Sequence, residues 1–376
     1  IEDEHGERSL ELGNALDRVV VALIADTAPF CDRAWLQRVG ERAVTIRRDR
    51  SEQDPPLKLA RSLSALGQIA HMREDYARAE ALQLEALDRA RSAAGPRHAE
   101  LFSIWLRLSN ARKRLTRYEE ARAALDRARE VADAAYGSSD RRVGTVELSL
   151  AMLARKQDDV DRAERRAIRA AEILDESPGA EVRVARTLGV LAWVARERGE
   201  YGLARERLQR ALQLELGVYG EGHPEVASRR VALGNVAWYE GDLPRARAYW
   251  ESALASFEAM GLRGTLEAVP SMSNVALAAR TLGDLAAAEA MHRESFYRAF
   301  SIAPDLDGAI AWSPGDRIVS FTPVAPYAPG TDYEIRLESD ATDTSGNSLL
   351  DSVVLGFRAP AQPLLEVTSV ARMSDG

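Results

Sequence analysis

Small and apolar residues recur along the middle of the chain at a fixed spacing. Six alanines recur at regular intervals. The residue 13 positions before each of them is apolar, and the residue seven positions after it is small. A period of 41 or 42 residues over more than half of the chain predicts one structural unit that is copied and stacked. The repeated alanines are Ala79, Ala121, Ala163, Ala204, Ala246 and Ala288.

Each unit is expected to be a pair of antiparallel helices. Apolar residues fall at helical spacing, as at Leu63, Leu66 and Ile69, and small residues between two helices let their axes approach closely. Five positions before each alanine the chain has glycine or a polar residue, which predicts a tight turn that needs a positive φ or a side-chain cap. These turn residues are Glu74, Thr116, Asp158, Gly199, Gly241 and Gly283.

The segments LGQIAHMREDYARAEALQLEAL (66–87), LAWVARERGEYGLARERLQRAL (191–212) and LGNVAWYEGDLPRARAYWESAL (233–254) show the pattern most clearly. The pattern resembles the tetratricopeptide repeat (TPR), with about eight residues more than the usual period near 34. The loop VYGEGHPEVA (218–227) resembles the kinesin-light-chain-like subclass. The resemblance implies a right-handed α-solenoid, a TPR superhelix, over roughly residues 55–300. It also makes His223 a loop residue before a helix that starts at Pro224, rather than a catalytic group.

The pattern changes at both ends of the repeat array. Residues 1–52 are predicted to form a degenerate helical cap, with helices over 8–25 and 31–49, because Gln37 stands where another repeated alanine would fall. Residues 53–299 would then hold six repeats.

After Phe300 the alternation of Tyr333, Ile335 and Leu337 predicts antiparallel strands. FSIAP (300–304), VSFTP (319–323) and DTSGN (343–347) resemble the bacterial Ig-like domain first seen in surface-layer proteins. A small, partial, all-β Ig-like domain is therefore expected at 300–360, with a tail or the start of a further module at 361–376. The fold class is mainly α.

Composition and charge limit the function. Residues 1–299 hold 46 basic and 47 acidic side chains, whereas residues 300–376 hold 4 basic and 11 acidic ones, which argues against nucleic-acid binding by the C-terminal module. No apolar run reaches the roughly 18 residues of a membrane span. Cys31 is the single cysteine, so an internal disulfide and a cysteine-cluster metal site are excluded. Because the chain begins at Ile1, we interpret it as a piece of a longer protein.

Motifs of catalysis are missing from the sequence. It contains no GxxxxGK[ST] or GxGxxG phosphate loop, no GxSxG nucleophile turn and no HExxH helix, and its five histidines are scattered. We therefore expect no catalytic residue, no cofactor and no metal.

The TPR resemblance implies that the first helix of each pair lines a concave groove. The residue eight positions before each repeated alanine should then point into the groove, and five of the six are basic or can become so. These residues are His71, Lys113, Arg155, Arg196, Trp238 and Arg280. The alternative is that they are solvated and interact with the dipole at the C-terminal end of their helix.

Two amides and an aromatic patch complete the predicted groove. Asn110 and Asn235 match positions where peptide-binding TPR proteins often place an amide, which can hold an extended backbone through a donor and an acceptor together. Trp193, Trp238 and Tyr239 would form a central aromatic patch. Such a groove suits an acidic peptide or partner protein with an apolar or aromatic anchor.

Three functions remain open at this point. The chain could be a non-catalytic protein- or peptide-binding scaffold. TPR arrays of this period often accompany bacterial Ser/Thr kinases and caspase-like CHAT proteases, so it could be the regulatory arm of a larger enzyme. The Ig-like segment favours a secreted or surface adhesion protein. The TPR resemblance implies a cytoplasmic location and the Ig-like resemblance an extracellular or envelope one, so the compartment stays open.

Overall fold

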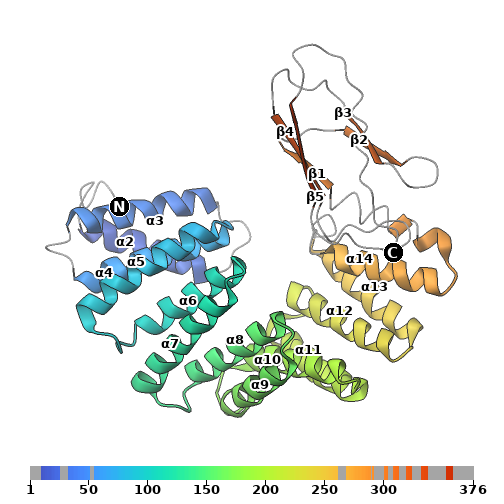
Figure 1. Cartoon of the computed structure of the whole chain (residues 1–376), viewed down its shortest axis with the longest axis horizontal. Coiled ribbons are helices and arrows are strands. Elements are labelled where there is room, and N and C mark those ends of the chain that lie inside the picture. The colour runs from blue at the N-terminus through green and yellow to red at the C-terminus, as the bar shows by residue number, and fades with distance from the viewer. Residues whose placement is uncertain are drawn as a thin grey trace. The chain divides into compact units, whose positions relative to one another are not determined.

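The computed structural model describes residues 10–25, 33–50, 55–260, 268–288 and 290–291, together with five strands between residues 300 and 358. The chain divides into two compact units, Ile1–Glu197 and Arg198–Gly376, and each is described by itself (Figure 1).

The first unit is built from helices that follow one another along the chain. They are α2 (Leu10–Ala25), α3 (Arg33–Asp49), α4 (Pro56–Met72), α5 (Tyr76–Ala94), α6 (Leu101–Arg114), α7 (Tyr118–Tyr136), α8 (Arg141–Lys156), α9 (Val160–Leu174) and α10 (Glu181–Glu197). The second unit contains α11 (Tyr201–Tyr219), α12 (Pro224–Tyr239), α13 (Leu243–Ala259) and α14 (Val269–Thr281), followed by the strands.

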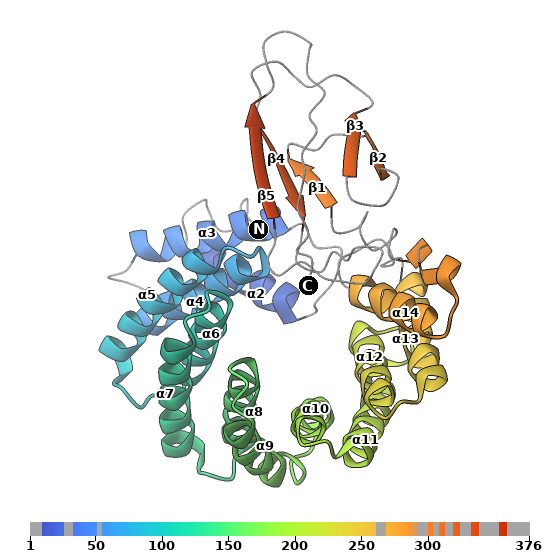
Figure 2. The ribbon, with the colours of Figure 1, turned by 45° about the vertical axis from the view of Figure 1, so that its right-hand side comes forward.

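Pairs of neighbouring helices in the first unit form two layers. The second helix of each pair packs on the first, as in α4 with α5, α6 with α7 and α8 with α9. The first helices also contact one another directly, α4 with α6 and α8 with α10. Figure 2 shows α6, α8 and α10 on one side of this unit and α7 and α9 on the other. We call the surface of α4, α6, α8 and α10 the first-helix surface.

The small and apolar columns of the repeat form the core. All six repeated alanines are at most 3% exposed, from Ala163 at 0% to Ala288 at 3%. The apolar residues 13 positions before them are also buried, as are the alanines seven positions after them up to Ala253. The next member of that column, Ser295, lies outside the described residues. The helix-pair prediction is therefore confirmed by the packing of its own marker residues.

The predicted tight turns are confirmed by their backbone angles. All six turn residues have a positive φ, from 53° at Asp158 to 86° at Gly283. Beside four of these turns, an aspartate caps the second helix, because its side chain accepts a hydrogen bond from the backbone N–H three residues ahead. These residues are Asp75, Asp159, Asp242 and Asp284.

Two glycines allow a close approach inside a helix pair. A Cβ on Gly67 would lie 2.5 Å from Nε2 of Gln83, and a Cβ on Gly234 would lie 2.4 Å from Nε1 of Trp250. The indole N–H of Trp250 donates to the carbonyl oxygen of Val231 at 3.2 Å. The missing side chain therefore lets a large, buried ring reach the backbone of its partner helix.

The predicted N-terminal cap is helical, with α2 and α3 at the expected places. Arg47 of α3 is 2% exposed and lies 2.5 Å from Asp17 of α2. It also donates to Ser62 of α4 at 2.9 Å and to Asn14 of α2 at 2.9 Å. This network joins the cap to the first repeat. Cys31 and the turn before it lie outside the described residues.

The second unit ends in short antiparallel strands: β1 (Phe300–Ala303), β2 (Gly308–Trp312), β3 (Val319–Pro323), β4 (Asp332–Leu337) and β5 (Val353–Arg358). One sheet has the order β1-β4-β5, and β2 pairs with β3 in another. In the first sheet, Ile335 of β4 is paired with Ile302 of β1 and with Leu355 of β5. The alternating segment thus forms a strand, as its period predicts, and the structure places this strand between β1 and β5. DTSGN (343–347) and the tail 361–376 lie outside the described residues.

Candidate partner-binding surface

Basic side chains are concentrated on the first helices of the first unit. The helices α4, α6, α8 and α10 carry thirteen Lys and Arg residues against three Asp and Glu residues. The second helices α5, α7 and α9 carry ten basic against eleven acidic residues. One layer of the unit is therefore strongly basic, although the repeat array as a whole is nearly neutral.

Two of these cations are partly buried and lack an acidic partner. Arg107 donates to the hydroxyl of Ser64 at 2.8 Å, and the Lys113 ammonium lies 3.4 Å from Oδ1 of Asn110. Among the described residues, neither has a carboxylate within ion-pair distance. Burial lowers the pKa of Arg107, and burial together with Arg114, Lys156 and Arg186 lowers the pKa of Lys113. Both sites are therefore electrostatically poised for an anion.

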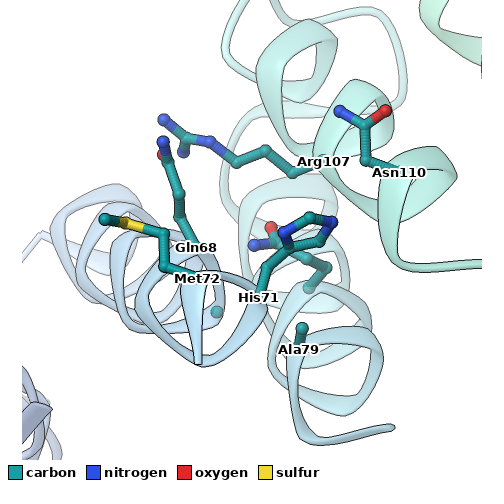
Figure 3. A pocket seen from close by; sticks show the side chains of 8 residues that line it. Gln68, His71, Met72, Ala79, Arg107 and Asn110 are labelled. Atoms are coloured by element: carbon teal, nitrogen blue, oxygen red, sulfur yellow. The ribbon is translucent and has the colours of Figure 1, made fainter. Parts of the chain in front are cut away.

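Arg107 lines a pocket of about 230 Å³ between α4, α5 and α6. Figure 3 shows Gln68, His71 and Met72 of α4 on one side and Arg107 and Asn110 of α6 on the other, with the side chain of Arg107 reaching from α6 towards α4. Two buried polar atoms of the lining, Oε1 of Gln68 and Nε2 of His71, have no hydrogen bond of ordinary geometry to any described residue. The remaining lining residues are Gly67, Ala79 and Gln83.

His71 lies in this pocket as a neutral group. Burial, and then the charges of Arg114 and Lys113, hold its pKa below the ordinary value. Its ring contacts the ring of Tyr76 edge-on, with centroids 5.2 Å apart. His71, which was expected to be one of the basic groove residues, is thus uncharged at neutral pH and lines the pocket.

Asn110 and Asn235, which were predicted to hold a peptide backbone, differ in the hydrogen bonds that their side-chain oxygens already make. Oδ1 of Asn110 is near Lys113, and its side chain lines the pocket. Oδ1 of Asn235 accepts the indole N–H of Trp250 at 3.0 Å and the amide of Asn274 at 3.3 Å. Asn235 therefore supports the core of the second unit with its oxygen, so only its amide nitrogen is left to hold a backbone carbonyl.

The aromatic residues are distributed over both units. Trp193 is a half-buried residue of α10 in the first unit. In the second unit, Trp238 packs against Trp250 with centroids 5.8 Å apart, and the 53% exposed Tyr239 stacks on Tyr201 at 5.8 Å. The joint patch of all three remains a prediction.

The three remaining predicted arginines lie near the C-terminal ends of first helices. Arg155 and Arg196 are half-buried, and Arg196 pairs with Glu197. Arg280 of α14 is exposed. Their position also suits an interaction with the helix dipole, so their role in binding remains a prediction.

The sequence interpretation missed Arg107. The position 14 residues before a repeated alanine is small or of medium size in the other units: Ala65, Ser149, Val190, Ala232 and Asn274. A single long cation in such a column is a signal that could have identified it.

His223, in contrast, behaves as predicted. It stands before Pro224 as the N-cap of α12, and its Nδ1 accepts the backbone N–H of Glu225 at 3.2 Å.

Comparison with known families gives the same repeats. A model described as tetratricopeptide repeat matches residues 58–134, 100–176, 142–215 and 183–259, which together cover more than half of the chain. The chain belongs to the tetratricopeptide repeat family. A model of the bacterial Ig-like domain matches residues 266–359, so the TPR array is followed by an Ig-like region. That match begins in the segment that contains α14, and the domain boundary at residue 300 remains a prediction.

Solved structures share the TPR fold at low sequence identity. BtubC (BKLC) from P. vanneervenii is 23% identical, with a TM-score of 0.52 over 61% of this chain and 93% of that chain. A Rap protein complexed with competence and sporulation factor is 13% identical, with a TM-score of 0.56 over 77% of each chain. NprR in complex with its cognate peptide NprX is 13% identical, with a TM-score of 0.52 over 75% of this chain and 77% of that chain. No curated protein matched the chain.

The described residues include neither a membrane-spanning helix nor a cluster of metal-ligating side chains. None of their helices combines the length and the apolar character that crossing a bilayer requires. Within the same residues, no group of three or more His, Cys, Asp or Glu side chains could hold a metal ion.

Proposed function

We propose that this protein is a non-catalytic TPR scaffold that binds an acidic, extended peptide segment of a partner on its first-helix surface. The observation that carries the proposal is the charge difference between the layers: thirteen basic against three acidic side chains on the first helices, and ten against eleven on the second helices. An acidic segment is the complementary ligand.

The partly buried cations strengthen this proposal. Arg107 and Lys113 are desolvated without a carboxylate partner in the described part of the chain. A partner carboxylate would meet cations that have already lost much of their hydration, so less free energy is spent on desolvation when the complex forms. Trp193 is a half-buried residue of α10 in the same unit and could hold an apolar or aromatic anchor of the same segment.

Two solved structures with the same fold support the ligand class. Their titles describe a Rap protein with competence and sporulation factor and NprR with its cognate peptide NprX. A TPR array of this general form can therefore hold a peptide, and we extend that use to this chain.

A peptide array tests the proposal. The full chain would be applied to acidic decapeptides with a central Trp or Leu, and to matched peptides with Gln for Glu and Asn for Asp. We expect the acidic set to be retained preferentially, and affinities of selected peptides to be measured by fluorescence anisotropy. Equal retention of the two sets would contradict the proposal.

Charge reversal locates the surface. Arg155→Glu and Arg196→Glu, on first helices, should each weaken binding of a selected acidic peptide by about tenfold, which is of the order of one charge-assisted contact. Arg89→Glu, at an exposed position on the second helix α5, is the matched control and should leave the affinity unchanged.

The Ig-like region favours a second candidate, an adhesion or envelope role. It rests on the match over residues 266–359. Fractionation of cells that express the intact gene tests it, since recovery only in the cytosol would exclude this role.

A further inference from the structure

We infer that the pocket between α4, α5 and α6 is a subsite for one carboxylate side chain, a glutamate or aspartate, of the bound peptide, held by Arg107 and by the amide of Gln68. This inference deepens the proposed function and rests on it for the identity of the ligand as a peptide. It assigns a specific place on the first-helix surface, and a specific chemistry, to one residue of the partner.

Within the described part of the chain, the guanidinium of Arg107 has one hydrogen-bond partner and no carboxylate partner. Its Nη1 donates to the hydroxyl of Ser64 at 2.8 Å. That hydroxyl in turn donates to Oε1 of Gln83 at 2.7 Å, and Gln83 donates back to the carbonyl oxygen of Ser64 at 2.9 Å. Ser64 and Gln83 are buried, so the guanidinium is anchored on a rigid neutral support. Its remaining N–H groups form a planar fork that matches a carboxylate.

Two neutral polar groups of the pocket are also incompletely hydrogen-bonded. Among the described residues, the buried Oε1 of Gln68 has no hydrogen-bond donor. The buried Nε2 of His71 makes no hydrogen bond of ordinary geometry there, although the backbone carbonyl of Asn110 lies close enough to raise the pKa of His71 slightly against the larger effect of burial. A buried polar atom left unpaired costs free energy, and a ligand that pairs it recovers that cost. A glutamate in a peptide supplies both kinds of group, because its carboxylate accepts hydrogen bonds and its backbone N–H donates one. A bare anion supplies only acceptors.

The size of the pocket favours a side chain. Its volume of about 230 Å³ is below the roughly 300–1,000 Å³ of sites that hold a drug-sized ligand or cofactor. Met72 and Ala79 provide an apolar wall along which the methylene groups of the side chain can pack.

Entry of a carboxylate should be coupled to a proton at His71. The charged groups near its ring are cations on α6, namely Lys113 and Arg114, with Arg107 in the same pocket and the phenol ring of Tyr76 on α5. Burial, and then the charges of Arg114 and Lys113, hold the pKa of His71 down in the free protein. A bound carboxylate offsets their field and favours the imidazolium, so binding takes up a proton and strengthens as the pH falls.

The methyl group of Met72 reports on the pocket directly. The full chain would be labelled with ¹³C at the methyl groups of its six methionines, and the Met72 signal would be assigned with Met72→Leu. The probes are N-acetylglutamate N-methylamide, its glutamine analogue, and free glutarate. We expect the glutamate probe to shift the Met72 signal at millimolar concentration and to bind at least tenfold more tightly than the glutamine analogue.

Variants and pH complete the test. Arg107→Gln should abolish the Met72 shift, whereas Arg89→Gln should not, with circular dichroism confirming that each variant is folded. If Arg107→Gln does not fold, Arg107→Lys replaces it and should weaken the glutamate probe at least threefold, because the fork is lost. Between pH 7.5 and pH 5.5 the affinity should rise about threefold in the wild-type chain but not in His71→Gln.

Each other outcome overturns the inference. Equal binding of the glutamate and glutamine probes would exclude a carboxylate subsite, as would unchanged binding by the Arg107 variant that was tested. Glutarate binding ten times more tightly than the peptide-like probe would assign the pocket to a free small acid. The small probes are independent of the peptides that the array selects. If the array shows no preference for acidic peptides but the glutamate probe shifts the Met72 signal, the proposed function alone is refuted. Selected peptides that bind without a Met72 response refute the subsite alone.

Discussion

At the residue scale, the titratable groups of the first-helix surface differ from what their side-chain type suggests. His71 belongs to a column that is otherwise mostly basic, yet burial and neighbouring cations lower its pKa. Lys113 and Arg107 remain cations in partly buried positions without carboxylate partners among the described residues. Function on this surface therefore depends on solvation as much as on residue type.

The lowered pKa of His71 makes stability depend on pH. Below the unfolded-state pKa near 6.5 the unfolded chain binds a proton that the folded chain does not, so the free energy of unfolding falls as the pH falls towards the folded-state pKa. His71→Gln should remove this loss, which one group limits to about 1.4 kcal/mol per pH unit. Urea unfolding at pH 7 and pH 5 measures the difference. His98→Gln controls for loss of a histidine outside the pocket, and an unchanged pH dependence in His71→Gln would contradict the assignment.

At the element scale, the turn between the two helices of each repeat contains a residue with a positive φ. In half of the repeats this residue is not glycine, although other side chains disfavour that conformation. Thr116 has φ 59°, a left-handed conformation that is costly for a β-branched side chain, whereas Gly241 holds the same turn at φ 79°. Thr116 is exposed, and its hydroxyl donates to the neighbouring carbonyl of Leu115. The turn geometry is imposed by the packing of the two helices and does not depend on glycine.

Exchange of these turn residues should therefore have opposite effects. We expect Thr116→Gly to raise the free energy of unfolding by roughly 0.5–1 kcal/mol, since relief of the strain exceeds the added entropy of the unfolded chain. Gly241→Thr should lower it by about 1–2 kcal/mol. Thermal unfolding of both variants is the measurement, and a destabilised Thr116→Gly would show that the turn is not strained.

The close approach at Gly234 gives a second prediction at this scale. In Gly234→Ala the new methyl group would overlap the Trp250 ring, which is 2% exposed and bonded to Val231 and Asn235. We expect a loss of about 1–3 kcal/mol, typical of overpacking in a core. Gly217→Ala in α11 is the control, because no heavy atom lies within 4 Å of its Cβ position. That change should be neutral or stabilising, since alanine favours a helix.

At the scale of the whole molecule, net charge and local charge have opposite signs. The chain carries a net charge of −8, yet its first-helix surface in the first unit is strongly basic. An acidic peptide is therefore attracted at short range although the protein as a whole repels it. Attraction of this kind is screened by salt.

Ionic strength should accordingly weaken peptide binding. We expect the affinity of an array-selected acidic peptide to fall roughly tenfold between 0.05 and 0.5 M NaCl, because the Debye length shortens from about 14 Å to about 4 Å. Fluorescence anisotropy at the two salt concentrations measures it. An affinity that rises with salt would point to apolar contacts as the main attraction and against the basic surface.

The repeat architecture was predictable from the sequence because it depends on residues that are close together in the chain and recur at a fixed period. Small residues at fixed spacing, apolar residues between them and special turn residues each act within one helix pair, so reading one unit is enough to read the others. The buried alanines and the positive φ values at Glu74, Thr116 and Asp158 confirm this. The strand alternation after Phe300 was recognisable for the same reason.

The binding surface was only partly predictable, because the hydrogen bonds that decide it join residues 15, 39 and 43 positions apart in sequence. The repeat spacing correctly placed His71, Asn110 and Lys113 on the first helices. It did not show that Oδ1 of Asn235 already accepts hydrogen bonds from Trp250 and Asn274. Nor did it show that Arg107 bonds Ser64 with no carboxylate beside it in the part of the chain that the structure describes. The sequence by itself determined the stacked helix pairs, since residues within one repeat specify each pair. Only the tertiary structure decided which polar groups are already satisfied and which are left for a ligand, since that depends on three-dimensional neighbours.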